Sequence, residues 1–374
     1  MVIREYSKVE LVFSSSESEA VKIALVNLRR DLIRTLDCSV TAGGIIRILV
    51  GTVGNLPELD EKADISKLRA EDGTYRKEAF LIQEKDGELL IVGTDRRGTI
   101  YGIYDFCEWL GVSPWYFFAD VPVRRRSEAV IENGYCKVDY PSVEYRGIFI
   151  NDEEELEHWV WRYMGETTIG VKTYEKIFEL LLRLKLNYIW PAMHVNSFNL
   201  KQENGALANR MGIVVGTSHC DMLMRSNNRE WKPWLAKKGY TDVEYDFSIP
   251  GRNREILKEY WRESVEQNRD FEVSYTVGMR GIHDSGFETK SLEGLTGEKL
   301  LKAKIELLES VMAAQQEILS ETLDTEPMKT FVPYKEVLEL YDNGLKVPED
   351  LTLIWTNDNY GYVRRYPGAV SYTH

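Results

Sequence analysis

The chain has 374 residues, of which 43% are hydrophobic and 29% are charged. One compact core seldom grows to this length, so the sequence predicts a globular protein of two domains. The formal net charge is -13, which argues against a nucleic-acid partner because phosphate binding needs an excess of Lys and Arg. An anionic substrate would therefore need a locally basic pocket.

The N-terminal residues lack the apolar stretch of a secretory signal. No apolar run reaches the roughly 18–20 residues that a membrane span needs. The four cysteines have no CxxC spacing, and the five histidines form no HxH or HExxH pattern. We therefore expect a cytoplasmic protein that acts without a membrane, a metal ion or another cofactor; an oxygen-liganded Ca²⁺ site is the alternative that these patterns leave open.

Residues 1–140 are predicted to form a small α/β domain. Apolar residues at helical spacing indicate its helices, and the turn Lys85-Asp86-Gly87 is typical of a hairpin. A boundary is expected in the polar stretch that follows Arg124-Arg125-Arg126. The expected elements are strands at 9–13, 46–50, 80–83 and 88–92 and helices at 16–32 and 99–110.

From residue 141 onward, six short apolar runs each end at polar residues of the kind used in catalysis. The runs are 144–150, 186–190, 212–216, 272–278, 329–333 and 351–355, and helices are expected at 174–184, 251–270 and 294–320. Strands that alternate with helices predict a parallel α/β sheet. Polar groups at successive strand C-termini are typical of a (β/α)8 barrel, which builds its active site there.

We therefore predict that residues 141–374 form a (β/α)8 TIM-type barrel that carries the catalytic site. A closed barrel needs eight strands, whereas about six are recognisable here. The expectation is a catalytic barrel that is incomplete at its C-terminus. Its open sheet edges would make the isolated chain unstable or poorly active.

Long motifs run in one order through almost the whole chain. They are Tyr101–Asp105 and Pro114–Phe117 in the first domain, then 145–153, 178–193, 216–219, 278–281, 334–337 and 355–361. Together they resemble the α-glucuronidases of glycoside hydrolase family 115. The resemblance implies removal of glucuronic acid or its 4-O-methyl ether from the α-1,2 branches of glucuronoxylan, or from an aldouronic acid, with inversion of configuration. It also implies a longer parent protein whose C-terminal domains make homodimer contacts.

An inverting glycosidase needs one carboxylic acid that protonates the leaving oxygen and one carboxylate that activates water, roughly 6.5–9.5 Å apart. The motif context points to Glu336 as the acid and to Asp284 as the base or water-positioning residue. Asp152, Glu153 and Asp221 are the rivals of Asp284. The alternative for any of these acids is a helix N-cap or a charge in the first turn of a helix.

A uronate substrate also needs a fixed cationic donor. Arg280 is the first candidate because it directly follows a strand, and Lys335 is the second. The alternative for Arg280 is a salt bridge to Asp284 or another acid of the site. His219 is expected to donate to a sugar hydroxyl or to the uronate, with a structural histidine as the alternative.

Further substrate contacts are expected at the ends of other strands. Tyr334 and Trp190 could stack on sugar faces, with core packing as the alternative for the tryptophan. Asn359 is expected to read a hydroxyl group, and His194 and Asp221 complete the predicted binding residues.

Two other functions stay open at this point. The first is a non-catalytic remnant that binds glucuronoxylan without turnover. The second is a different barrel hydrolase of the hexosaminidase type, because a small domain with a similar Arg-Gly-Thr-Ile-Tyr-Gly run precedes the barrel there as well. That type uses an adjacent acidic pair after a middle strand, and no Asp-Glu pair follows the fourth run here.

Overall fold

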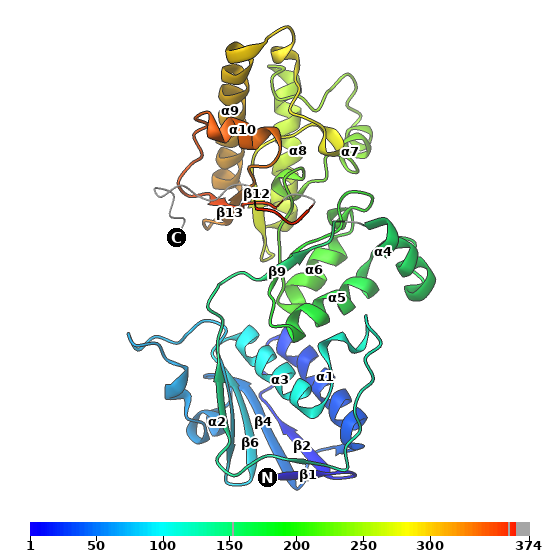
Figure 1. The fold of residues 1–374 in the computed structure, drawn as a ribbon, viewed down its shortest axis with the longest axis vertical. Coiled ribbons are helices and arrows are strands. Elements are labelled where there is room, and N and C mark those ends of the chain that lie inside the picture. The colour runs from blue at the N-terminus through cyan, green and yellow to red at the C-terminus, as the bar shows by residue number, and fades with distance from the viewer. Residues whose placement is uncertain (152, 358–359, 364–374) are drawn as a thin grey trace. The chain divides into compact units, whose positions relative to one another are not determined.

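The structure is a computed structural model that describes residues 1–151, 153–357 and 360–363 (Figure 1). It is a mixed α/β fold, and its residues form two compact units. The first unit contains Met1–Gly147, Tyr174–Tyr188 and Arg210–Ile213. The second contains Ile148–Thr173, Ile189–Asn209 and the chain from Val214. The division into domains at residue 140 stays a prediction.

The first unit is built on a six-stranded sheet of order β3-β2-β4-β6-β5-β8. Strands β2, β3, β4 and β6 run parallel, whereas β5 is antiparallel to β6 and β8. A separate antiparallel pair joins β1 to β7. The strands are β1 (Val2–Arg4), β2 (Lys8–Val12), β3 (Ser39–Val40), β4 (Ile46–Thr52), β5 (Phe80–Lys85), β6 (Glu88–Gly93), β7 (Glu128–Val130) and β8 (Cys136–Asp139).

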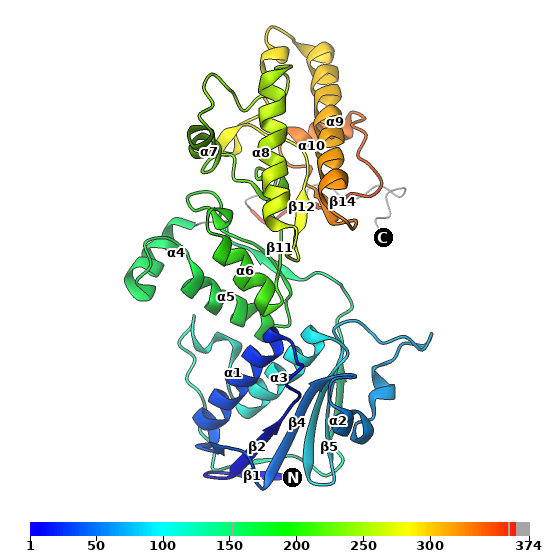
Figure 2. The ribbon, with the colours of Figure 1, turned by 180° about the vertical axis from the view of Figure 1, so that it is seen from behind.

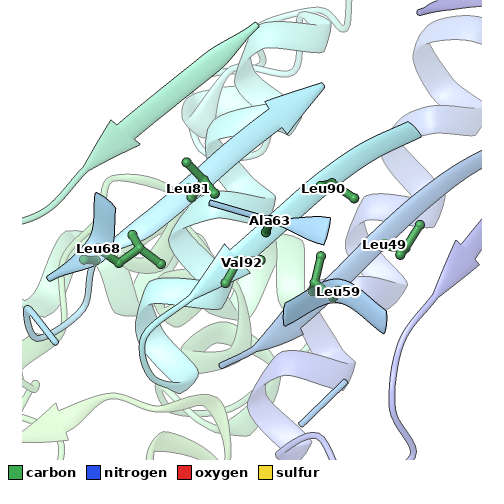
Figure 3. Packing of buried hydrophobic residues seen from close by; sticks show 8 residues of the cluster. Leu49, Leu59, Ala63, Leu68, Leu81, Leu90 and Val92 are labelled. Atoms are coloured by element: carbon green, nitrogen blue, oxygen red, sulfur yellow. The ribbon is translucent and has the colours of Figure 1, made fainter. Parts of the chain in front are cut away.

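Helices cover both faces of this sheet (Figures 1 and 2). α1 (Glu19–Leu36) and α3 (Arg96–Leu110) pack together on one face, and α2 (Pro57–Lys62) contacts β4 and β6. Because side chains alternate along a strand, Leu90 faces α2 while Ile91 faces α3. Figure 3 shows the α2 side, where Leu49, Leu90 and Val92 lie around Leu59 of α2. Burial on both faces explains why the middle parts of β4 and β6 are continuously apolar.

The two helices and the hairpin predicted in the first unit are present, and local residues show why they begin and end where they do. Ser18 caps α1 by accepting a hydrogen bond from the Val21 N–H at 3.3 Å. Gly111 ends α3 with φ 110°, a left-handed conformation that costs glycine little. Asp86 and Gly87 connect β5 to β6 with φ 53° and 81°, the left-handed pair that a tight hairpin needs.

The glycine at 102 lets α3 lie close against the sheet. A Cβ atom there would meet Ile91 Cγ2 at 2.9 Å. One turn earlier, a Cβ at Gly98 would meet the Ala79 carbonyl oxygen at 2.2 Å. The Arg-Gly-Thr-Ile-Tyr-Gly run therefore serves helix–sheet packing.

Helix α5 (Val171–Arg183) contributes most of its length to the first unit. Its Arg183 donates to Asp31 Oδ2 at 2.6 Å and to Glu179 Oε1 at 2.9 Å. Arg30 of α1 donates to the same Glu179 oxygen at 2.7 Å. We call Arg30, Asp31, Glu179 and Arg183 the α1–α5 cluster. Burial alone would raise the pKa of Glu179, but Arg183 and Arg30 outweigh burial and lower this pKa to about 2.

The second unit carries the predicted series of strands. β11, β10 and β9 form one sheet in that order, and β12, β13 and β14 form another. A parallel bridge between Val215 and Val273 connects β11 to the start of β12, so the six strands follow each other in chain order. They are β9 (Gly147–Phe149), β10 (Tyr188–Trp190), β11 (Val214–Val215), β12 (Ser274–Thr276), β13 (Met328–Phe331) and β14 (Thr352–Leu353).

All six predicted strands are thus present, each shorter than its apolar run. The pairs β12–β13 and β13–β14 are parallel, as expected. The sheets within the described ranges are not closed, so the predicted (β/α)8 barrel, expected here in incomplete form, is not shown by these strands. The remaining helices are α4 (Glu153–Trp159), α6 (Gln202–Met211), α7 (Trp231–Lys238), α8 (Arg252–Asn268), α9 (Gly297–Thr322) and α10 (Glu336–Asp342).

Within the described part of the chain, no helix combines the length and the apolar composition that crossing a bilayer requires.

Candidate functional site

Five charged or polar side chains from the ends of three strands meet in the second unit. His219 follows β11, Arg280 and Asp284 follow β12, and Lys335 and Glu336 follow β13. The C-terminal ends of parallel neighbours lie at one edge of a sheet, which brings these loops together. We call these five residues the Arg280 cluster.

Arg280 joins the two carboxylates that the sequence marked as a catalytic pair. Its Nε and Nη2 donate to the two oxygens of Glu336 at 3.0 and 2.8 Å, a bidentate fork. Its Nη1 forms an ion pair with Asp284 Oδ1. The Arg280 side chain is only 2% exposed, whereas Asp284 is 29% and Glu336 21% exposed. Both carboxylates therefore reach solvent while the cation between them does not.

His219 is a neutral donor to Asp284. Its Nε2 lies 2.9 Å from Asp284 Oδ1. Burial, followed by the nearby charges of Arg280 and Lys335, lowers the pKa of His219 to about 4. A neutral imidazole that bonds a carboxylate through Nε2 must carry its hydrogen there.

Lys335 and Tyr334 complete the edge of the cluster. Lys335 Nζ donates to Asp284 Oδ2 at 2.7 Å and is half exposed. The Tyr334 ring lies 4.5 Å from the His219 ring, measured between centroids. Lys335 has φ 51°, a left-handed conformation that non-glycine residues adopt only when their surroundings hold them there. Such strain is often found at functional sites.

Chemically, the cluster presents two solvent-reachable carboxylates, each held by several neighbouring groups. Glu336 accepts from Arg280 and from the Phe287 N–H at 3.1 Å. Asp284 accepts from His219 and Lys335 and pairs with Arg280. The salt bridge that the sequence left as the alternative role for Arg280 is therefore present.

Glu153, a predicted rival catalytic acid, is buried at 1% exposure. Its carboxylate accepts hydrogen bonds from the backbone N–H groups of His194, Val195 and Asn196 at 2.5, 2.9 and 2.9 Å. The Asn196 side chain donates to it as well, at 3.2 Å. This geometry gives Glu153 a role in holding a loop.

Asp221, the other rival, is also buried. Burial, then the nearby Glu230 carboxylate, raises the pKa of Asp221 well above its usual range. Glu230 itself is 1% exposed and accepts from Arg225 Nη1 at 2.8 Å and from Ser197 Oγ at 2.6 Å. Asp221 and Glu230 are therefore two buried acids that influence each other's charge. The sequence did not indicate this, because the residues before α7, which include Glu230, have the composition of an ordinary polar loop.

The other predicted contacts are dispersed. His194 is exposed, and its ring lies 4.3 Å from that of His283 between centroids. The Trp190 ring packs on Phe149 at 5.3 Å. Asp152 and Asn359 lie outside the described residues. The roles predicted for all of these side chains stay predictions.

Among the described residues, no group of three or more His, Cys, Asp or Glu side chains is arranged to hold a metal ion.

Comparison with known proteins identifies the family. The family model described as Glycosyl hydrolase family 115 matches residues 138–373. A solved structure of a family GH115 4-O-methyl-alpha-glucuronidase, BtGH115A, described as specific for decorated arabinogalactans, has a TM-score of 0.86 and 34% sequence identity. That match covers 99% of this chain and 47% of BtGH115A, so this chain spans about half the length of that relative.

A more distant solved structure, CpGH84D, has a TM-score of 0.53 and 12% identity over 97% of this chain and 54% of its own. At this identity the likeness concerns the fold alone. No curated protein matches the chain. The family-model match covers more than half of the 374 residues, and the BtGH115A structure agrees over nearly all of them. The chain belongs to glycosyl hydrolase family 115.

Proposed function

We propose that this chain supplies part of the active site of a glycoside hydrolase that releases glucuronic acid, or its 4-O-methyl ether, from α-1,2 branches of a plant polysaccharide. The observation that carries the proposal is the Arg280 cluster, which holds two solvent-reachable carboxylates on either side of one buried guanidinium. Membership of family 115 and the likeness to a 4-O-methyl-alpha-glucuronidase support the same chemistry.

In the proposed reaction Glu336 is the acid and Asp284 is the base. Asp284 takes a proton from a water molecule, whose oxygen attacks the anomeric carbon of the uronic acid. Glu336 gives its proton to the leaving oxygen as the glycosidic bond breaks, which inverts the anomeric configuration. His219, a donor to Asp284, would orient that carboxylate.

Arg280 and Lys335 are proposed to recognise the uronate. Because both edges of Arg280 already bind carboxylates, a uronate can bind this fork only by displacing Glu336 or Asp284. Lys335 is the more accessible cation of the two. Tyr334 lies beside both and is proposed to contact the sugar ring.

We further propose that β9 to β14 form six strands of a (β/α)8 barrel. Their unbroken order and the convergence of functional groups after β11, β12 and β13 support this arrangement.

The identity of the polysaccharide main chain that carries the branch can be tested directly. We propose glucuronoxylan, and decorated arabinogalactan is the second candidate because BtGH115A is described as specific for it. A non-catalytic chain that only binds these branches is the competing function, and measuring both binding and release distinguishes the two.

The test is release of glucuronic acid from glucuronoxylan, from decorated arabinogalactan and from a short aldouronic acid by the 374-residue protein. Loss of an acid or base typically lowers the rate by about 10²–10⁴-fold, so Glu336→Gln and Asp284→Asn should each reduce release to that extent. Glu339→Gln is the matched control, because Glu339 is an exposed acid in the same first turn of α10. No release by a folded wild-type protein that still binds aldouronic acid would replace this proposal with the binding function.

A further inference from the structure

The Glu153 carboxylate shapes the loop that follows β10. It is bound by three consecutive backbone N–H groups, those of His194, Val195 and Asn196. A buried carboxylate that gathers several N–H donors is a strong and directional constraint. Removing it would leave three backbone donors, one of them fully buried, without their acceptor, so the loop would have to rearrange.

The same loop is held from its other side by the segment after Ser226. Asn228 Nδ2 and Arg229 Nε both donate to the His194 carbonyl oxygen at 3.2 Å. The Asn227 side chain binds the loop after β12: it accepts a hydrogen bond from the His283 N–H at 3.2 Å and donates one to the Gly281 carbonyl oxygen at 3.2 Å. The loops after β10 and β12 are thus both bound to the segment 227–229.

Across these two loops the His194 ring lies on the His283 ring, with 4.3 Å between centroids. His283 and Asp284 are two consecutive non-glycine residues with left-handed backbones, at φ 57° and 59°. Such a pair persists only where its surroundings hold it. The ring contact with His194 and the hydrogen bond from the His283 N–H to Asn227 both restrain His283.

We infer that Glu153 is a positioning residue that sets the place of Asp284. Glu153 fixes the backbone of residues 194–196, and this backbone places the His194 ring against the His283 ring. Because Asp284 directly follows His283 in the chain, the position of His283 determines that of Asp284. The inference rests on the proposed function, because Asp284 is the base of the proposed reaction. Glu153 itself does not contact the Arg280 cluster in any hydrogen bond or ion pair of the described residues.

The first test compares steady-state kinetics of Glu153→Gln with those of the wild type on an aldouronic acid. Misplacement of a reacting group by about 1 Å can cost roughly 100-fold in rate, so kcat should fall by about this factor. KM should change far less than kcat, because Glu153 is 1% exposed and forms no hydrogen bond or ion pair with the Arg280 cluster within the described residues. Glu154→Gln is the matched control: Glu154 is the exposed neighbour on the same helix, and its substitution should leave kcat unchanged.

A second variant keeps the test decisive if Glu153→Gln does not fold. His283→Asn removes the ring but keeps a residue that tolerates a left-handed backbone. It should lower kcat in the same way as Glu153→Gln. If His283→Asn and a folded Glu153→Gln both keep wild-type kcat, or if only KM changes, the inference is overturned.

An activity-independent readout separates this inference from the proposed function. The Hε1 resonance of His283 senses the ring current of His194, and it should move in Glu153→Gln but not in Glu154→Gln. If the wild type releases no glucuronic acid yet this resonance moves, the proposed function fails while the positioning by Glu153 holds. If the resonance stays in place in a folded Glu153→Gln protein, the positioning by Glu153 fails.

Discussion

The α1–α5 cluster and the Arg280 cluster use the same parts in different surroundings. In each, one buried arginine binds two carboxylates: Arg183 binds Asp31 and Glu179, and Arg280 binds Asp284 and Glu336. Asp31 and Glu179 are 0% and 5% exposed, whereas the carboxylates of the Arg280 cluster are 29% and 21% exposed. A closed cluster can only stabilise the fold, while a cluster whose acids reach solvent can exchange partners and protons with a substrate. Both clusters contain ion pairs, so the exposure of their acids is what distinguishes the cluster with a structural role from the one with a proposed catalytic role.

The largest expected effect comes from breaking the closed cluster. Arg183→Met leaves Asp31 and Glu179 buried without this partner, and losing one partner of a buried pair typically costs about 3–5 kcal/mol. Urea unfolding should show that loss in the free energy of unfolding. Arg29→Met, at an exposed position of α1, should change the same quantity by less than about 0.5 kcal/mol. A loss for Arg183→Met as small as that of its control would mean that the buried pairing adds nothing.

A substitution in the Arg280 cluster should lower the catalytic rate more than the free energy of unfolding. Arg280→Lys keeps the charge but replaces a planar fork with a single ammonium, which cannot hold two carboxylates in fixed places. We expect kcat/KM on an aldouronic acid to fall by about 100-fold, with a far smaller change in the free energy of unfolding than for Arg183→Met.

The matched control is Arg262→Lys. Arg262 forms a surface pair with Glu321 on the outside of α8, and this substitution should alter neither quantity. An Arg280→Lys protein with wild-type kcat/KM would show that the bidentate fork is dispensable, and it would contradict a catalytic role for the Arg280 cluster.

The two clusters should also lose stability in different pH ranges. His219 has a folded pKa of about 4, below the usual value of about 6.5, so the unfolded chain takes up its proton first. This histidine therefore lowers the free energy of unfolding as the pH falls from about 6.5 to 4, on the order of 3 kcal/mol in all. Glu179, with a folded pKa of about 2, lowers it only as the pH falls below about 4.3.

Unfolding curves of the wild type and of His219→Gln between pH 7 and 4 test this difference. The variant should show a flatter dependence on pH than the wild type in this range. Glu179→Gln should keep the wild-type slope there and flatten the curve only at lower pH. Equal slopes for the wild type and His219→Gln would mean that folding does not lower the pKa of His219.

Much of the fold could be predicted from local signals. Apolar periodicity marked α1, α3, α5, α8 and α9, and cap and turn residues such as Ser18 and Asp86-Gly87 act locally, so their effects are visible in sequence. The six strands of the second unit were recognisable because each apolar run ends at polar residues. The sequence also suggested a (β/α)8 barrel, but no local pattern can establish one, since closure of a sheet depends on long-range contacts between its edge strands.

The sequence identified the members of the Arg280 cluster but could not decide between their roles. Arg280 could bind a substrate or a neighbouring acid, and only its geometry shows that it binds both Glu336 and Asp284. Glu153 was a candidate catalytic acid because it follows a strand. In the structure its carboxylate accepts hydrogen bonds from backbone N–H groups that lie more than 40 residues further along the chain. Long-range partners of this kind leave no mark in the spacing of residues.

Helix α5 has a practical consequence for dissecting the protein. A fragment beginning at residue 141, the boundary that the sequence indicates, would keep Glu179 and Arg183 but discard Arg30 and Asp31. Such a fragment would expose charged residues on a helix face built to be covered, and it should aggregate or be degraded during expression. Subcloning and limited proteolysis should therefore keep α1 and α5 in one polypeptide.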